Sequence, residues 1–439
     1  MSGIAIFALV WATIAATSPG TQRPATALGS GCAPMAMPAG RVVSVTSRQA
    51  SLLGTIVARA QPGDVIVLAD GTYRVSGDVV MNFQRPHVSL ISASRDASKV
   101  IIDGGADYAA REVVQITASD VTVAHITLRH ARDHLVHLSP GARADIGDIM
   151  LFGLSLEDAG QQFLKSNTDG SEASFDTAHF VDRVTVACSS FTMSDAGRRY
   201  VPTNPSNKSY PCYTGGLDAH AAAGWIVSRN RFEGIYCEGN SLSEHAIHFW
   251  LSGRDQVIER NVIINCARGI GLGLGDGAGV HERPFADHPH AGDKRGAYAG
   301  NYGGVIRNNV IYADVAPFDS GISLEQAMGA RVLHNTVVVT GAANGNAIEY
   351  RFPNSLVEIS NNLATSIQQR DGGRGVMTHN VLNPAAAIFV DPGRQDFRLS
   401  RSASMAIGQG LPQKDAGLDM SGRAHDSVAP DVGAYVFRR

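Results

Sequence analysis

Several short segments of this chain carry charged and polar side chains that could act together on one surface. Seven of them share a pattern in which an apolar residue precedes two outward positions, since side chains in a strand alternate between faces. The first outward row reads His137, Lys165, Asp218, His248, Gly271, Ser323 and Glu349, and the second reads Ser139, Asn167, His220, Trp250, Gly273, Glu325 and Arg351. Strands stacked about 4.8 Å apart would bring the middle of both rows into one charge cluster.

This cluster has the groups that removing a proton beside a carboxylate requires. Such a β-elimination needs a base, positive charge or donors for the resulting enediolate, and an acid for the leaving oxygen. The candidate catalytic residues are Lys165, Asp218, His220, Glu244, His245 and His248. Among these, Lys165, His220 and His248 are the base candidates, and Asp218 could orient a histidine and set its tautomer.

A glycine pair and an aromatic ring beside the cluster suggest room for a sugar. Gly271 and Gly273 remove side chains where a ring could lie against the backbone. Trp250 could present a flat face to that sugar, although a large aromatic ring is often buried beneath a loop. Guanidinium groups match the fork of a carboxylate. The residues expected to bind substrate are His137, Asn167, Trp250, Arg254, Arg268, Gly271, Gly273, Glu325, Glu349 and Arg351.

The cluster is expected to be exposed, so replacing Lys165 or His248 with Ala should abolish turnover and leave the fold intact.

Two other functions could use the same residues. A glycoside hydrolase needs two carboxylates about 5–5.5 Å or about 6.5–9.5 Å apart, which Asp218 and Glu244 could supply. A non-catalytic carbohydrate-binding protein would explain Trp250 but not the cluster, although structural networks also collect such residues.

The elements that position these residues follow from an internal repeat. An apolar residue, two variable residues and Asn recur, with the Asn at positions 230, 261, 308, 335, 361 and 380. Asn tolerates a left-handed corner, and its amide can bond to the Asn one coil above. Short strands at this spacing predict an all-β, right-handed parallel β-helix, a solenoid with three short strands per coil.

The chain divides around this solenoid. Residues 1–27 read as a signal peptide, with the apolar run 4–16 and a cleavage site at Ala25-Thr26-Ala27. Residues 28–60 hold an N-terminal segment and a helical cap, Ser47 to Arg59. The solenoid spans 61–395, and 396–439 form a tail on its last coils. Long loops at 194–213 and 276–302 are expected on one face, the second basic enough to suit an anionic sugar.

Several of these segments resemble carbohydrate-active parallel β-helix proteins, including pectate, alginate and chondroitin lyases. The resemblance rests on Asp70-Gly71-Thr72-Tyr73, the strand–Asn units, and the C-terminal runs 396–399 and 430–435. It covers roughly residues 60 to 437 and concerns architecture, because no lyase family's catalytic motif is intact. It implies a polysaccharide-degrading enzyme, and the charge cluster favours a lyase acting on a uronate polymer.

The sequence assigns no metal ligands, although calcium is possible. Calcium-binding aspartate clusters of the pectate lyase kind are not evident, and no other cofactor is expected. A calcium ion that bridges substrate and protein would need no visible motif.

Composition limits the partners and the compartment. The 439 residues carry a net charge of -3, which does not suit nucleic-acid binding, and no segment predicts a membrane span. A secreted monomer, extracellular or periplasmic, is expected to meet a polysaccharide. The five cysteines contain no CxxC, and Cys212 with Cys237 is the first candidate disulfide.

Overall fold

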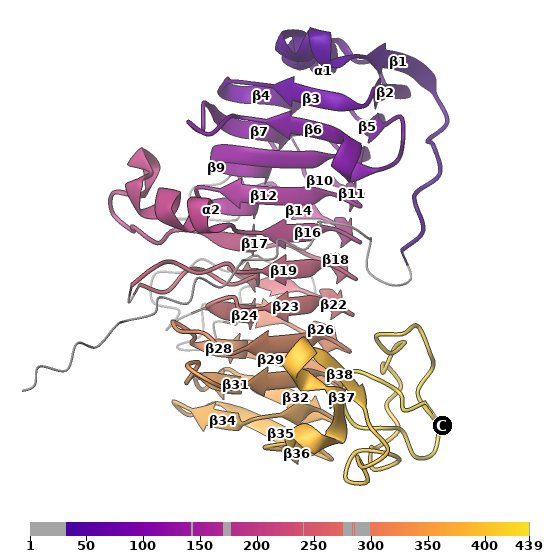
Figure 1. Ribbon diagram of the computed structural model, residues 1–439, viewed down its shortest axis with the longest axis vertical. Helices are drawn as coiled ribbons and strands as arrows, with labels where there is room; N and C mark the ends of the chain where they lie inside the picture. Colours follow the sequence, from indigo (N-terminus) through magenta and orange to yellow (C-terminus); the bar gives the residue numbers. More distant parts are fainter. Residues whose placement is uncertain are drawn as a thin grey trace, which may run out of the picture.

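The chain winds into a tall, nearly closed solenoid of short parallel strands that follow the sequence from one end to the other (Figure 1). The computed structural model describes residues 32–141, 144–169, 177–239, 241–274, 283, 285 and 299–438. The predicted all-β class and parallel pairing are confirmed. The proposed signal peptide lies outside the described residues, as does most of the basic loop 276–302.

One stack of paired strands forms the first side of the solenoid. Its members are β1 (Arg41–Val45), β2 (Asp64–Leu68), β5 (Val88–Ser92), β8 (Val121–Ala124), β11 (Met150–Phe152), β15 (Thr185–Ala187), β18 (Ile226–Ser228), β22 (Val257–Glu259), β26 (Val305–Arg307), β29 (Ala327–Leu333), β32 (Leu356–Ser360) and β35 (Arg374–Thr378). Two short strands, β21 (Gly253–Arg254) and β25 (Asn301–Tyr302), join it through β29.

A second stack runs beside the first. Its members are β3 (Gly71–Arg74), β6 (Val100–Asp103), the start of β9 (Thr127–Leu138), β12 (Ser155–Ala159), β16 (Ser190–Thr192), β19 (Arg231–Glu233), β23 (Val262–Ile264), β27 (Val310–Ala313), β30 (Thr336–Val339), β33 (Leu363–Ala364) and β36 (Val381–Leu382).

A third stack carries the two outward rows, and we call it the ladder sheet. Its members are β4 (Gly77–Phe83), β7 (Ala110–Ile116), the end of β9, β13 (Gln162–Ser166), β17 (Gly215–His220), β20 (Ile247–Trp250), β24 (Arg268–Leu272), β28 (Ser320–Glu325), β31 (Asn346–Arg351) and β34 (Ile367–Arg370). Two separate pairs stand apart: β10 (Ile146–Gly147) with β14 (Val181–Asp182), and β37 (Phe389–Asp391) with β38 (Asp396–Leu399).

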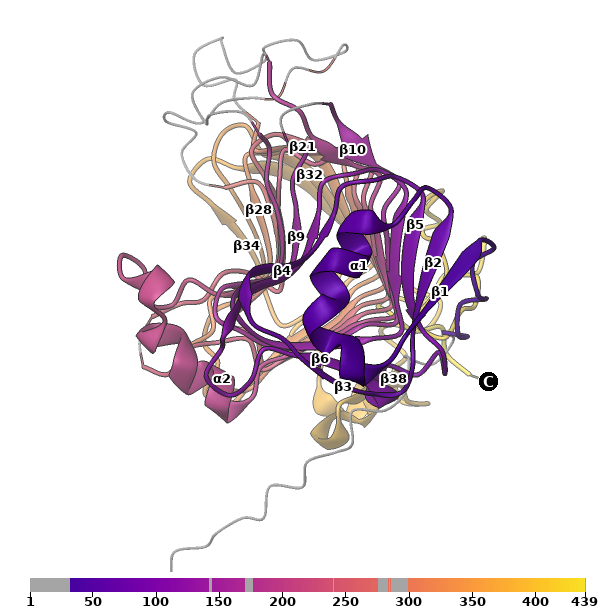
Figure 2. The same ribbon diagram turned by 90° about the horizontal axis from the view of Figure 1, so that it is seen from above.

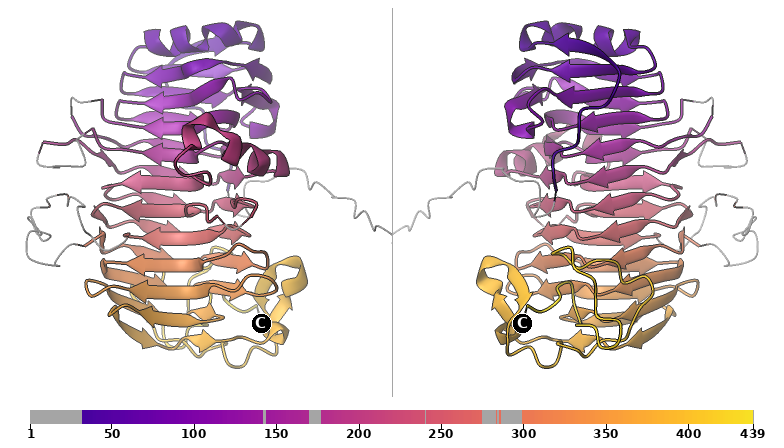
Figure 3. Two further views of the ribbon diagram at one scale, coloured as in Figure 1. Left: turned by 90° about the vertical axis from the view of Figure 1, so that its left-hand side faces the viewer. Right: turned by 90° about the vertical axis from the view of Figure 1, so that its right-hand side faces the viewer.

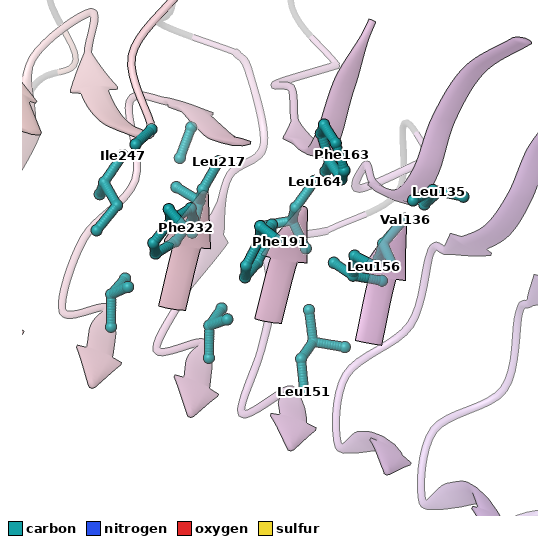
Figure 4. Close-up of a cluster of buried hydrophobic side chains, with 14 of the residues drawn as sticks. Leu135, Val136, Leu151, Leu156, Phe163, Leu164, Phe191, Leu217, Phe232 and Ile247 are labelled. Carbon is teal, nitrogen blue, oxygen red and sulfur yellow. The ribbon is translucent and has the colours of Figure 1, made fainter. Parts of the chain in front are cut away.

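The core fills the interior of the solenoid with apolar side chains from all three stacks. Leu164, Leu217 and Ile247 are directly paired on successive coils of the ladder sheet and are fully buried. Figure 4 shows them beside Phe191 and Phe232 from the second stack, whose rings stack with centroids 4.3 Å apart. This column is why the register of the ladder sheet is fixed, since a one-residue slip would turn every apolar side chain outward.

A buried asparagine ladder runs up one corner, but not through all the predicted residues. Its members are Asn230, Asn261, Asn309, Asn335, Asn362 and Asn380. From Asn261 onward, each side-chain oxygen accepts from the side-chain and backbone N–H groups of the preceding member, as Asn309 does from Asn261 at 3.0 and 2.9 Å. The prediction was therefore wrong at Asn308 and Asn361. Those residues have φ of 54° and 59° and make the left-handed corner one position earlier.

Two consecutive residues build each corner. The first has a left-handed backbone, and the second has a buried side-chain amide. The left-handed residue turns the chain, and Arg229, Arg260 and His334 fill that position in other coils. The following Asn keeps its amide pointed into the interior. Sequence alone could not separate these tasks, because Asn satisfies both of them.

Replacing Asn309 with Ala should lower the free energy of unfolding by about 1–3 kcal/mol, the cost of buried polar groups without partners. The substitution removes the acceptor for the Asn261 amide and the donor to the Ile258 carbonyl, 2.9 Å away. Chemical denaturation measures this difference. His379, exposed with φ of 51°, is the matched corner control. His379→Gly should change stability by less than about 1 kcal/mol, because glycine adopts that backbone freely. A similar loss in both variants would contradict the role of the buried amide.

Short helices lie at the ends and edges of the solenoid. The 3-10 helix η1 (Ser47–Leu52) and α1 (Leu53–Arg59) lie over the first coil (Figure 2), and buried Leu53 and Val57 pack into the core. The helix α2 (Asp195–Tyr200) projects from the side. The remaining 3-10 helices of the described residues are η2 (Ala97–Lys99), η3 (Val201–Thr203), η4 (Pro205–Asn207), η6 (Ala386–Ile388) and η7 (Pro392–Arg394).

The last described segment folds back along the final coils, as both views in Figure 3 show. Phe389, Phe397 and Val432 form a separate buried cluster with Val310 and Leu363 of the second stack. Among the described residues, no helix is long and apolar enough to cross a membrane.

The described residues form two disulfides. Cys212 pairs with Cys237, as predicted, and Cys32 pairs with Cys188, which the sequence did not reveal. Cys266 is a buried free thiol. Paired cysteines of this kind persist in oxidising compartments, so they indicate an extracellular protein.

Candidate active site

The outward rows predicted from the sequence lie side by side on the ladder sheet. Lys165 pairs with His137 on one side and Asp218 on the other, and Asp218 pairs in turn with His248. His220 pairs with Trp250 in the second row. The gap of 53 residues between Lys165 and Asp218 is therefore a single coil with a long excursion, and no coil intervenes.

The Lys165 ammonium connects the two rows. Its Nζ donates a hydrogen bond to Asp218 Oδ2 and lies 2.8 Å from His220 Nε2. An ammonium can only donate, so His220 accepts at Nε2 and its ring proton belongs on Nδ1. His220 is thus held as a neutral imidazole by its neighbour.

The Asp218 carboxylate contacts most of the other side chains of the cluster. Besides Lys165, it accepts a hydrogen bond from Trp250 Nε1 at 2.7 Å, and His248 Nδ1 lies 3.8 Å from Oδ1. The Trp250 ring stacks in parallel with the His248 ring and meets the edge of His220 at a centroid distance of 4.6 Å. Trp250 also packs on the cluster of Phe180, Ala221 and Leu251, so a sugar-binding role remains a prediction for its exposed part only.

The charge states follow from burial and pairing. Burial acts to raise the pKa of Asp218, but Lys165, and then His220 and His248, bring that pKa well below its ordinary value of 3.8. Burial acts to lower the pKa of Lys165, but Asp218 raises it above 10.5. Burial and then Lys165 lower the pKa of His220 below 6.5. At neutral pH the lysine is therefore charged, and His220 is the unprotonated group beside it.

The expectation that this cluster is exposed was wrong. Lys165, Asp218 and His248 are only 4%, 3% and 2% exposed, and His220 alone among the four is partly accessible. Lys165 is held by Asp218 and His220 of the neighbouring strand, so its ammonium does not extend into solvent. A hollow of about 270 Å³ lies elsewhere, lined by Arg74, Asp103 and other residues of the N-terminal coils.

The predicted glycine floor was also wrong. The His245 ring fills the space above Gly271, where an added Cβ would lie 2.7 Å from Nε2. Gly273 has φ of 78°, and an added Cβ would lie 1.8 Å from the carbonyl oxygen of Glu325. One glycine makes room for an imidazole and the other for a tight backbone crossing, so neither leaves a seat for a sugar.

The arginines proposed to hold a substrate carboxylate already pair with acidic side chains. Arg268 lies 2.8 Å from Asp319, Arg254 lies 2.8 Å from Asp255, and Arg351 lies 3.0 Å from Asp371. All three are partly exposed at the surface. They are spread over different coils, and a substrate carboxylate would have to compete with these partners.

The other predicted binding residues form small networks along the same sheet. His137 Nδ1 lies 3.0 Å from Glu112, and its Nε2 lies 3.3 Å from the Asn167 amide. Glu349 is buried and accepts from Arg370 at 2.8 Å, while Glu325 lies 3.9 Å from Arg351. These networks extend the polar surface without joining the Lys165 cluster directly.

Sequence reasoning missed Tyr213 as a member of the site. It follows Cys212, whose disulfide to Cys237 fixes the end of the excursion that contains α2. Its phenol interacts electrostatically with Lys165, Asp218 and Glu244; burial first, and then the two carboxylates, raise its pKa above 10.0. The signal was its position directly between the predicted disulfide and β17, which the ladder pattern does not cover.

One group among the described residues could hold a metal ion. Ligand atoms of Glu244, His245 and His248 all lie within 4.8 Å of one another. Calcium takes six to eight oxygen ligands, so a set with two imidazoles does not fit the calcium ion left open by the sequence. No chemical step is therefore assigned to calcium.

No protein-family description matches the chain, and no curated protein sequence matches it either. Solved structures do resemble it. Pectate lyase Pel9A has a TM-score of 0.54 at 13% identity, covering 93% of this chain and 98% of that one. An alginate lyase from Paenibacillus sp. str. FPU-7 gives 0.37 at 14% identity, covering 77% and 99% of the two chains. A GH136 lacto-N-biosidase from Eubacterium ramulus gives 0.45 at 12%, covering 79% and 68%.

The similarity to Pel9A extends over nearly the whole of both chains and shows a common fold. The predicted resemblance to parallel β-helix polysaccharide lyases is thereby confirmed as a resemblance of architecture. At 13% identity a common fold does not carry residue roles from one protein to the other.

Proposed function

We propose that the protein is a secreted lyase that cleaves an anionic, uronate-containing polysaccharide by β-elimination. The observation that supports this most directly is the Lys165 ammonium, held between Asp218 and the neutral His220. It holds a buried positive charge next to an unprotonated base, His220, which is partly accessible at the edge of the ladder sheet. A carboxylate on each sugar of the polymer would share this ammonium with Asp218, which is already paired with it.

The reaction needs only proton transfers and charge stabilisation. A base removes the proton on the carbon beside the carboxylate, and that electron pair forms the new carbon–carbon double bond. The bond to the glycosidic oxygen breaks, and this oxygen leaves with a proton from an acid. Charge builds up on the carboxylate during the first step, where a fixed cation stabilises it most.

Three side chains suit these three tasks. His220 is the base, because it is the partly accessible, unprotonated imidazole of the cluster. Lys165 is the cation, and its raised pKa argues against its use as the base. Tyr213 is the acid, because a phenol is protonated at neutral pH and this one interacts electrostatically with Lys165 and Asp218.

Substrate binding would also prepare the base. Lys165 occupies the lone pair of His220 Nε2 when no substrate is present. A substrate carboxylate offers the ammonium a stronger acceptor than a neutral imidazole. Once Lys165 turns toward it, Nε2 is free to take the proton.

Asp218 then acts as a positioning residue. It fixes the ammonium and the Trp250 indole through its two oxygens. The same contacts count against a glycoside hydrolase that uses Asp218 and Glu244. A fully ionised, buried and ion-paired Asp218 cannot donate a proton to a leaving group.

The Lys165 cluster lies on the ladder sheet, so a bound polymer could run along the stacked strands of that sheet. Strands β9, β28 and β34 face the same side of the molecule, and α2 projects beside them (Figure 2). We place the polymer along this face, next to the α2 excursion that ends at Tyr213. We further propose that the solenoid is right-handed with three strands per coil, since parallel crossovers are right-handed in about 98% of cases.

A panel of uronate polymers tests the proposed function. The wild-type protein should release oligosaccharides with an unsaturated end, seen as new ultraviolet absorbance that rises together with the reducing ends. Reducing ends without that absorbance would replace the lyase with a hydrolase. No new ends on any polymer, with binding retained, would leave a non-catalytic carbohydrate-binding protein.

A further inference from the structure

The corner before β20 and the strand itself bring an acidic side chain and two imidazoles together. Glu244 and His245 precede the strand, and His248 lies on it. Their ligand atoms lie within 4.8 Å of one another, and the two rings have centroids 4.3 Å apart. We infer that Glu244, His245 and His248 form a site for a borderline transition-metal ion such as Zn²⁺.

The second nitrogen of each histidine is already held by the protein. His248 Nε2 lies 3.0 Å from the Gly273 carbonyl oxygen, which can only accept, so Nε2 carries the proton and Nδ1 keeps its lone pair. His245 Nε2 lies 3.0 Å from the Ser323 hydroxyl. Metal-binding histidines generally have this arrangement, because the outer hydrogen bond fixes the ring and its tautomer.

A second, independent observation at His245 supports a metal ligand at this site. The residue is 4% exposed, and its Nδ1 is buried without a hydrogen-bond partner. A buried imidazole nitrogen without a partner costs free energy that a metal bond would recover. Gly271 shows that the space for this ring is built into the sheet, since any larger residue there would displace it.

The donor set selects the kind of ion. Two imidazoles and one carboxylate are typical of zinc sites, and imidazole also suits copper and nickel. Three protein ligands leave a fourth position for water or an anionic group. The ligand atoms of the three side chains already lie at most 4.8 Å from one another.

The three ligands differ from the residues proposed to transfer protons. The test therefore measures metal binding rather than turnover. The full chain is stripped with a chelator, dialysed and titrated with Zn²⁺, Ca²⁺ and Co²⁺ alone. His281, His288 and His290 in the loop are first replaced with Ala, so that they cannot contribute a second site. This background should bind one equivalent of Zn²⁺, and Co²⁺ should give the intense visible absorption of a tetrahedral complex.

Three variants in this background locate the ion. His245→Ala should weaken Zn²⁺ binding by more than about a hundredfold, and Ser323→Ala by about tenfold through the outer hydrogen bond. Glu244→Gln keeps the size of a half-buried side chain and should also lose tight binding. The exposed His87→Ala is the control and should bind like the background. The assignment fails if the background binds no Zn²⁺, prefers Ca²⁺, or binds Zn²⁺ equally well in the His245 and Glu244 variants.

Discussion

Replacing Lys165 with Met should lower the free energy of unfolding by about 3–5 kcal/mol, because it leaves the buried Asp218 carboxylate without its cation. Asp218→Asn should cost a similar amount, since the ammonium is then the uncompensated charge. Both groups are charged between their ordinary pKa values of 3.8 and 10.5, so the loss should be present throughout that pH range. Urea denaturation at neutral pH measures it.

The double variant separates stability from activity. Lys165→Met with Asp218→Asn removes both charges, while the new amide can still accept from Trp250 Nε1. It should recover most of the stability lost by either single variant, since replacing a whole buried pair is often nearly neutral. It should not recover turnover if Lys165 stabilises charge during the reaction. Purely additive losses in stability would contradict the pairing of the two residues.

His220→Gln should reduce kcat by about 10²- to 10⁴-fold, the usual contribution of a positioned base. The amide can still accept the hydrogen bond from Lys165 but cannot take the substrate proton. His220 is partly accessible at the edge of the cluster, so the fold and the melting temperature should change little. Steady-state kinetics on the active polymer gives the comparison, with exposed His87→Gln as the control.

The pH profile provides a second readout for the same residue. Protonation of His220 would remove the base, so kcat/KM should fall on the acid side, at a pH below 6.5 because burial and Lys165 lower its pKa. Lys165, Asp218 and His248 are the charged and titratable groups that face it. A normal acid limb that persists in the His220→Gln variant would assign the base elsewhere.

The pairing along the ladder sheet could be predicted from sequence because one rule controls it. Apolar residues such as Leu217 and Ile247 must point inward, and period-2 alternation then fixes Asp218 beside His248. The pairing of Lys165 with Asp218 followed from the same rule, even across the long excursion. The disulfide of Cys212 and Cys237 was also predicted, because both flank one coil.

The predictions of an exposed Lys165 and an open space at Gly271 were wrong because the strand pattern gives the face of a side chain but not its rotamer or its neighbours from other segments. The pattern puts Lys165 on the outer face, but its hydrogen bonds to Asp218 and His220 hold the ammonium out of solvent. Gly271 was interpreted as empty space, because nothing in the ladder indicates that His245 folds over it from the corner. Cys32 reaches Cys188 across 156 residues, a contact that no local spacing could indicate.

The masses of the oligosaccharides released in ¹⁸O-labelled water test the proposed β-elimination most directly. A lyase breaks the glycosidic bond without adding water, so every new pair of ends should lack the label. One product of each cleavage should be lighter by one water molecule than its hydrolytic counterpart. Cleavage should also be absent from His220→Gln. Products that carry one ¹⁸O per cleavage would contradict elimination at the Lys165–Asp218–His220 cluster and make the protein a hydrolase.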